Sequence, residues 1–227
     1  MKAPPIEMTG GAFVCPLRCM AIQQAVEVLY GVIVSKEPDV FCRNRLWEPL
    51  YQVLSMKKKI TPLQRERFLR DEDFIVSKTD PKGRITYANR VFTEFAGYSE
   101  EELLGTQHNI IRHPDMPRAV FKMMWETLQE GREFFGYLKN LASDGSFYWT
   151  FANVTSTCNE HGDTVSYFSV RRKPSRAAIA VLEPVYADML AKEKEAGPSA
   201  AIEISRKIIQ DCYQPKGETY EQFVLAL

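Results

Sequence analysis

The strongest constraint on the fold lies in the segment SFYWTFANVTST (146–157), where large aromatic residues occupy every second position. Successive residues of a strand point to opposite faces of a sheet, so a period of two predicts a strand. The two alternating sets are Phe147, Trp149 and Phe151, and Tyr148, Thr150 and Ala152. The tripeptide Ser143-Asp144-Gly145 just before it is typical of a hairpin turn. A second strand, predicted over 133–142, should therefore pair with it in antiparallel fashion.

Strand patterns occur in two further places. DFIVSKTD (73–80) and RITYAN (84–89) are joined by Asp-Pro-Lys-Gly (80–83), in which proline presets φ and glycine permits a positive φ. This arrangement predicts a hairpin. A last strand is predicted over 164–173, after a turn at 159–163.

Helical signals separate the hairpin from the three later strands. Asn89 can cap a helix over 90–98, and the capping box that begins at Ser99 opens a short helix ending near Gly105. A longer helix is predicted over 116–131. Its apolar face comprises Val120, Phe121, Met124, Trp125 and Leu128. The order of elements predicts an α+β fold, with five antiparallel strands and short helices on one face of the sheet.

Composition shifts divide the chain into four regions. We predict an N-terminal extension of helical character (1–55), a linker or N-cap helix (56–71), the α+β domain (72–173) and a helical tail (174–227). The tail contains a helix over 174–196, kinked at Pro184, and a second helix over 200–213. These tail helices pack on the domain, bind a partner, or join a second subunit. A chain that begins at Met56 is expected to fold and bind ligand by itself, because every motif lies further on.

Charge and cysteine content narrow the classes of function. Lysine plus arginine equals aspartate plus glutamate at 29 each, which argues against a broad basic face for nucleic acid or a membrane. Five cysteines without regular spacing are typical of reduced, cytoplasmic thiols. The best membrane candidate, 21–34, is too short to span a bilayer and contains polar residues. We therefore expect a cytoplasmic protein without a membrane span.

The stretch HNIIRHPDMP (108–117) is unusual in its density of polar groups. It holds two of the chain's three histidines, together with Arg112 and Asp115. Pro114 rules out a helix interior, and with Pro117 it stiffens the turn. Guanidinium and imidazole groups suit phosphates, which predicts an anion-binding turn. An ordinary capped turn before the next helix is the alternative that remains open.

Several motifs together resemble the PAS sensor domain of bacterial aerotaxis receptors. They are ITYAN (85–89), GYSEEELLG (97–105), HNIIRHPDMP (108–117), MWETL (124–128), KNLASDG (139–145), YW (148–149) and SVRRKPS (169–175). The resemblance covers about residues 72–190. It implies a PAS fold that binds FAD non-covalently, senses redox state or oxygen, and has neither catalytic nor metal-binding residues.

The resemblance and the chemistry of the turn together assign the cofactor-binding residues. They are Asn89, His108, Asn109, Arg112, His113, Asp115, Phe121, Trp125, Asn140 and Trp149. Arg112 is expected to contact the phosphates, and Asp115 to orient its neighbours. Trp125 and Phe121 are expected to wall the ring, with Phe135 and Tyr137 as weaker candidates. Asn89 and Asn140 are expected at the ring edge, because an amide can both donate and accept.

The expected function is a non-enzymatic redox sensor. Unlike the aerotaxis and other chemotaxis receptors, the chain is expected to have no membrane anchor or long coiled coil, so its output is expected to run through a partner protein in trans. A homodimer through the flanking helices is left open. The alternatives are FMN as cofactor, a cofactor-free PAS interaction module, and a haem-binding gas sensor through His113 or His108. A photoreceptor with a cysteine adduct is disfavoured, because Cys158 is the single cysteine of the region and lies near the last turn.

Overall fold

The computed structural model describes residues 60–197 and 200–227 of the chain. The predictions for the extension 1–55, which includes the segment 21–34, lie outside the described residues. The first elements in order are β1 (Ile75–Thr79), β2 (Ile85–Ala88), α4 (Arg90–Ala96), α5 (Glu100–Leu103), the 3₁₀ helix η1 (His108–Ile111) and α6 (Arg118–Gln129). Three strands follow: β3 (Phe134–Leu141), β4 (Phe147–Cys158) and β5 (Thr164–Arg172). The predicted order of strands and helices is confirmed.

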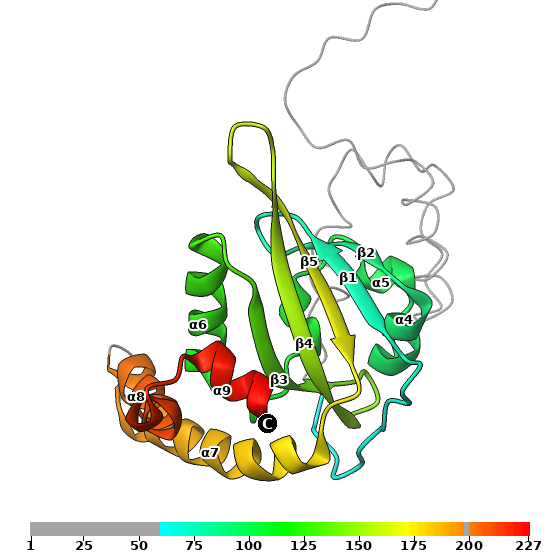
Figure 1. The fold of residues 1–227 in the computed structure, drawn as a ribbon. Helices are drawn as coiled ribbons and strands as arrows, with labels where there is room; N and C mark the ends of the chain where they lie inside the picture. The colour runs from blue at the N-terminus through cyan, green and yellow to red at the C-terminus, as the bar shows by residue number, and fades with distance from the viewer. Residues whose placement is uncertain (1–59, 198–199) are drawn as a thin grey trace, which may run out of the picture. The chain divides into compact units, whose positions relative to one another are not determined.

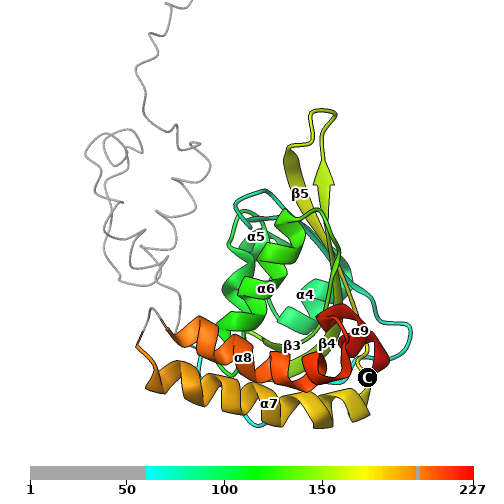
Figure 2. The same cartoon turned by 60° about the vertical axis from the view of Figure 1, so that its left-hand side comes forward.

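The strands form one antiparallel sheet in the order β2-β1-β5-β4-β3 (Figure 1). Cross-strand register decides which side chains share a face. Ser77 lies opposite Ser169, which lies opposite Val154, and we call their side the inner face. Lys139 lies opposite Trp149 on the other side, the outer face. Figure 2 shows α4, α5 and α6 gathered on one side of this sheet, as predicted.

The helix starts follow the predicted capping chemistry. The Asn89 side chain accepts a hydrogen bond from the backbone N–H of Phe92 at the start of α4. Ser99 and Glu102 form the predicted capping box of α5. Gly83 ends the β1–β2 turn with a φ of 76°, a conformation that glycine adopts without strain.

The linker between α5 and α6 crosses the sheet from one edge to the other. At the β2 edge, Ile85 N–H donates to Thr106 O at 2.9 Å and His108 N–H donates to Gly83 O at 2.9 Å. At the β3 edge, Arg112 forms an isolated antiparallel bridge with Asn140. The linker thus protects both edges of the sheet and passes over its inner face.

The tail forms three further helices, α7 (Arg176–Glu195), α8 (Ala201–Tyr213) and α9 (Tyr220–Ala226). α7 continues through Pro184 and packs against outer-face side chains of β3 and β4. The rings of Tyr186 and Trp149 lie 6.2 Å apart, and the Tyr186 hydroxyl donates to Tyr137 O at 3.1 Å. α9, which begins with a capping box at Thr219, was not expected. Of the three alternatives for the tail, these contacts support packing on the core; binding of a partner or of a second subunit stays a prediction.

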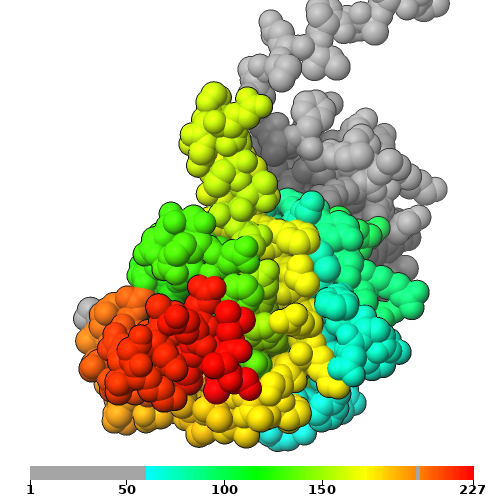
Figure 3. Space-filling view, viewed as in Figure 1, coloured from blue at the N-terminus to red at the C-terminus, as the bar shows by residue number. Residues whose placement is uncertain are grey.

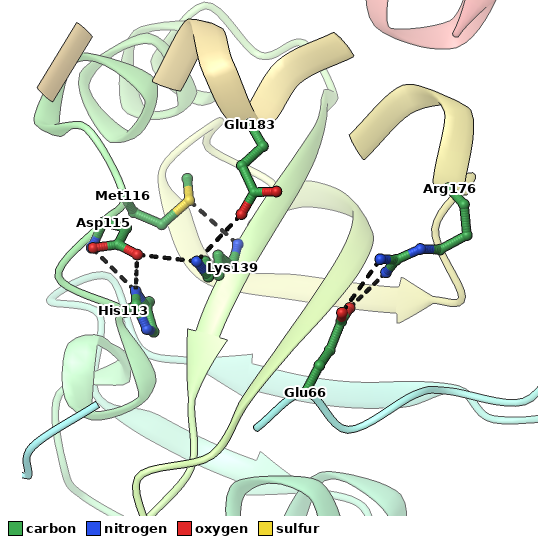
Figure 4. Close-up of polar contacts among 7 residues, drawn as sticks. All are labelled: Glu66, His113, Asp115, Met116, Lys139, Arg176 and Glu183. Carbon is green, nitrogen blue, oxygen red and sulfur yellow. Dashed lines mark hydrogen bonds and ion pairs between the residues drawn. The ribbon is translucent and has the colours of Figure 1, made fainter. Parts of the chain in front are cut away.

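The chain before β1 lies alongside the start of β4 in extended form. Arg67 N–H donates to Phe147 O at 2.8 Å, and Phe147 N–H donates to Arg65 O at 2.9 Å. Glu66 forms an ion pair with Arg176 at the start of α7, with a closest distance of 2.6 Å (Figure 4). Residues 60–71 contain no helix, so the alternative of an N-cap helix is wrong for these residues. A start at Met56 would keep all these contacts, and that prediction stands.

On the face shown in Figure 3, the surface of the domain is continuous except at one projecting hairpin. The tip of the β4–β5 hairpin stands clear of the sheet, and the tail helices form a continuous surface with the rest of the domain (Figure 3). In the described ranges, no helix is both long enough and apolar enough to cross a membrane.

Candidate ligand-binding cavity

A cavity of about 270 Å³ lies between the inner face of the sheet, the linker and α6. Its walls are apolar and aromatic, from Phe121, Met124, Trp125, Leu138, Val154 and Tyr167. Its polar lining comes from both strands and linker, with Ser77, His108, Arg112, Asn140, Ser169 and Arg171. A few polar groups in an apolar pocket are typical of a small-molecule site.

The wall formed by α6 explains why its predicted apolar face is only partly buried. Val120 and Leu128 are fully buried in the core. Phe121, Met124 and Trp125 are half-buried, and all three line the cavity. Trp125 meets Tyr167 of β5 edge to face, with ring centroids 5.0 Å apart. The exposed part of this helix face therefore belongs to the cavity.

A buried polar group lies on the inner face at the β1–β5 junction. The Arg171 guanidinium donates to the Ser77 hydroxyl, and Ser77 Oγ lies 3.1 Å from His108 Nε2. The His108 ring stacks on Phe92 at 5.7 Å. Burial, with a contribution from the positive charge of Arg171, lowers the pKa of His108 to about 3. His108 is therefore neutral at physiological pH.

Asn140 lines the cavity from β3, where its amide is held by the sheet. Nδ2–H donates to Leu138 O at 3.3 Å and to Thr150 Oγ1 at 3.2 Å. These bonds fix the plane of the amide group. A ligand in the cavity would meet an amide of fixed orientation.

Arg112 also lines the cavity, at the point where the linker reaches the β3 edge. Its Nη2 donates to Met116 O at 2.9 Å, and its guanidinium lies 4.2 Å from the centre of the Phe121 ring. Burial lowers its pKa from the usual value. Among the described residues no ion pair includes Arg112, so the guanidinium remains available to an anionic ligand.

The structure brings six of the predicted site residues together around the cavity. They are His108, Asn109, Arg112, Phe121, Trp125 and Asn140. The other four, Asn89, His113, Asp115 and Trp149, do not line it. Phe135 and Tyr137, the weaker wall candidates, pack against Phe151 on the outer face instead.

The Asn89 side chain bonds to backbone groups and does not line the cavity, so the structure gives no support to its predicted place at a ring edge. Its Oδ1 accepts from the N–H groups of Val76 and Phe92, both at 3.0 Å. Its Nδ2 donates to Phe74 O at 2.7 Å. The side chain therefore caps α4 and ties it to β1.

His113 and Asp115 belong to a separate cluster beyond the β3 edge (Figure 4). Lys139 Nζ, from the outer face, lies 2.9 Å from Asp115 Oδ2 and 3.4 Å from Glu183 Oε1 on α7. His113 Nδ1 accepts from Asp115 N–H at 3.1 Å, and burial lowers the pKa of His113 to about 4. The imidazole is thus neutral, and its 3.4 Å approach to Asp115 Oδ2 is not an ion pair. This cluster joins the turn to the tail helix.

Trp149 is likewise placed on the outer face, where only 3% of it is exposed. It packs against Tyr186 of α7 rather than walling the cavity. The alternation in 146–157 correctly predicts strand β4, but side chains on both faces of this strand are buried. Alternation alone cannot tell which of two buried faces meets a ligand.

Sequence reasoning missed the strand residues that line the cavity. They are Ser77, Thr79, Tyr167, Ser169 and Arg171. A signal existed: these residues recur at every second position of β1 and β5, where an antiparallel pairing places polar groups on one face. Arg171 is the most consequential of them, because it is only 1% exposed.

The comparisons with known proteins agree with this architecture. Residues 85–171 match a family model described as the PAS fold. The chain is 40% identical over 123 residues to the aerotaxis receptor of Escherichia coli (strain K12), a match that covers 54% of this chain and 24% of the receptor. Residues 85–171 therefore form a PAS domain, and this domain is similar in sequence to the aerotaxis receptor.

Other relatives of the PAS domain are also regulatory proteins. A nitrogen fixation regulatory protein of Klebsiella pneumoniae is 33% identical over 97 residues, which covers 43% of this chain and 20% of that protein. A solved light-oxygen-voltage domain, from a study with a flavin analogue, is 25% identical with a TM-score of 0.41, covering 54% of this chain and 85% of that one. The match spans only about a quarter of the receptor and a fifth of the regulator.

Proposed function

We propose that this PAS domain binds FAD non-covalently in the inner-face cavity and acts as a redox sensor rather than as an enzyme. The observation that carries the proposal is the cavity itself. Its aromatic wall on α6 would complement a flat ring, and its two arginines, which form no ion pair with any described residue, would complement acceptor-rich groups and a phosphate. The relationship to the aerotaxis receptor supports the same chemistry.

The size of the cavity limits how FAD would fit. Ligand sites are usually about 300–1,000 Å³, and this cavity, at about 270 Å³, is large enough for a ring system rather than a whole dinucleotide. Phe121 and Trp125 would wall the ring, and Asn140 would face its edge. Arg112 would bind a phosphate of FAD at the mouth of the cavity, where the part of FAD beyond the ring would leave it. When bound, the flavin would supply a redox couple that responds to electron supply.

The output would run through α6, which joins the cavity to the tail. Glu193 of α7 accepts from the backbone N–H groups of Arg118 and Ala119 at 3.0 Å, at the start of α6. Arg206 of α8 forms an ion pair with Glu126 of α6. A change of ligand state that moves α6 would therefore bias the positions of α7 and α8, and a partner protein would respond to the shifted population.

The setting proposed for this signalling is the cytoplasm, with a partner acting in trans. Cys158 and Cys212 are free thiols, as in proteins of reducing compartments. A homodimer through the tail helices is an alternative form of output. Cys158 is exposed and lies outside the cavity, so cysteine-adduct photochemistry finds no support in the described residues.

An absorption spectrum of the purified full chain tests the proposal, followed by release and mass determination of the cofactor. The expected result is a yellow protein with flavin absorption and the mass of FAD. The mass of FMN would correct the cofactor, and a colourless protein that takes up no flavin would favour the cofactor-free interaction module. A Soret band would indicate haem, with His108 as its ligand, because His113 lies outside the cavity.

A further inference from the structure

Arg171 is a buried cation whose charge has no partner in the described structure. Its side chain projects from β5 into the inner face and lines the cavity. One of its nitrogens, Nη2, donates to the Ser77 hydroxyl. Nε and Nη1 are buried and have no hydrogen-bond partner among residues 60–197 and 200–227. Three N–H groups of a charged side chain are therefore left unsatisfied at the cavity, where an unpaired polar group is costly.

The groups around Arg171 do not neutralise it. No ion pair among residues 60–197 and 200–227 includes Arg171. His108, its neighbour across Ser77, is neutral, and the Phe92 ring lies 4.7 Å from the guanidinium. Burial lowers the pKa of Arg171 to about 10, which still leaves it protonated at neutral pH. A buried charge of this kind normally has a carboxylate partner.

The neighbouring Arg172 provides the contrast on the same strand. Its side chain is exposed and lies over Phe151 of the outer face, 4.9 Å from the ring centre. Solvent satisfies this second guanidinium. The two adjacent arginines differ mainly in the face of the sheet that they occupy.

We propose that Arg171 is the counter-charge for the ligand: its free N–H groups donate to an acceptor-rich or anionic edge of the ring bound in the cavity. This inference rests on the proposed function and adds to it. Arg112 would bind the phosphate, and Arg171 would bind the ring. A fixed positive charge at that edge favours the form of the ligand with more negative charge there. For a flavin this is the reduced form, so Arg171 raises the reduction potential.

The test compares Arg171→Met and Arg171→Lys with the control Arg172→Met. The first measurement is thermal unfolding of protein stripped of ligand. Arg171→Met is expected to melt at the wild-type temperature or above it, because methionine removes an unsatisfied buried charge while keeping apolar volume. The control is expected to change the melting temperature little.

The second and third measurements use FAD itself. Arg171→Met is expected to bind oxidised FAD at least tenfold more weakly than wild type, with Arg171→Lys between them. Its affinity for reduced FAD is expected to fall at least tenfold more than its affinity for oxidised FAD does. That extra loss corresponds to a fall of about 30 mV in the two-electron midpoint potential.

The outcomes separate this inference from the proposed function. A wild-type chain that takes up no flavin overturns the flavin proposal alone; a stable Arg171→Met chain then still supports an unsatisfied charge that serves another acceptor-rich ligand. Arg171→Met protein that melts well below wild type, together with Arg171→Lys protein that keeps wild-type affinity and potential, overturns the inference. Arg171 would then be a packing residue held by Ser77 and Phe92.

Discussion

The two faces of the sheet are built from similar residues but differ in how their polar groups are satisfied. On the outer face, Lys139 is paired with Asp115 and Glu183, and Trp149 is covered by Tyr186 of α7. On the inner face, Arg171 lies beside a cavity with two nitrogens unpartnered. The charge of Lys139 on the outer face is therefore paired within the protein, whereas two nitrogens of Arg171 on the inner face have no partner among the described residues.

This difference between the faces explains why polar residues are so dense in the stretch 108–117. The stretch supplies residues both to the cavity on the inner face and to the cluster with Lys139. His108 and Arg112 line the cavity. His113 and Asp115, only a few residues later, join the outer cluster with Lys139. The linker passes over the β3 edge between them, at the bridge of Arg112 with Asn140. One dense polar motif therefore serves two different purposes.

The largest difference is expected between two tryptophans. Trp149→Ala removes a buried ring from the outer face and should cost about 3–5 kcal/mol of unfolding free energy. Trp125→Ala, at the half-buried cavity wall, should cost clearly less stability but weaken FAD binding more. Denaturant unfolding of ligand-free protein and FAD titration of the folded variants measure both effects.

The opposite result would contradict a binding site on the inner face. If Trp149→Ala protein that is still folded binds FAD far more weakly, while Trp125→Ala binds normally, then the ligand lies against the outer face.

Arg112 and His113 provide a second pair, one from each side of the linker. Arg112→Ala should weaken FAD binding about ten- to a hundredfold, the effect of about 1.5–3 kcal/mol from a lost charge-assisted bond. FMN binding should suffer less, because FMN has one phosphate instead of two. His113→Ala should lower stability and leave FAD affinity unchanged, contrary to the expectation from sequence. Isothermal titration with both flavins decides; equal losses for the two variants would return His113 to the site.

Much of this fold could be predicted because its signals are local. The hairpin at 80–83, the caps at Asn89 and Ser99 and the alternation in 146–157 each act within a few residues. The site was predicted less completely. Side-chain direction depends on register between strands far apart in sequence. Local patterns therefore indicate neither that Arg171 lines the cavity nor that Trp149 lies under α7. The cover of the outer face by α7 is likewise a long-range contact.

Acid should destabilise the protein through both buried histidines. The unfolded chain binds a proton at each histidine near pH 6.5, whereas the folded protein does so at about pH 3 for His108 and about pH 4 for His113. Stability is therefore complete above pH 6.5 and is lost as the pH falls through this window. For each histidine, the free energy of unfolding falls by about 1.4 kcal/mol per pH unit below pH 6.5, or by about 2 kcal/mol at pH 5.

Unfolding of ligand-free protein between pH 7 and pH 5 measures this slope. His108→Gln should flatten it by about half, as should His113→Gln. His161→Gln, in the exposed turn between β4 and β5, is the matched control. A slope unaffected by either buried histidine would contradict the assigned burial of these rings.

Asn140→Ser should produce the smallest effect, on the inner face alone. Its amide is fixed by Leu138 O and Thr150 Oγ1, so it offers a ligand one orientation. If it bonds the two redox states unequally by about 1.4 kcal/mol, the midpoint potential should shift by roughly 30 mV. Spectroelectrochemical titration beside a thermal melt measures this. Unchanged potential and occupancy with a lower melting temperature would leave Asn140 a purely structural role.

The most direct test of the contrast between the faces is NMR of the tryptophan indole N–H groups during addition of FAD. The chain has three tryptophans, of which Trp125 lies at the cavity and Trp149 lies under α7. Assignment by single Trp→Phe variants identifies each signal. If FAD binds at the inner face, the Trp125 signal shifts or broadens on binding while the Trp149 signal stays in place. A shifted Trp149 signal with an unchanged Trp125 signal would contradict binding at that face.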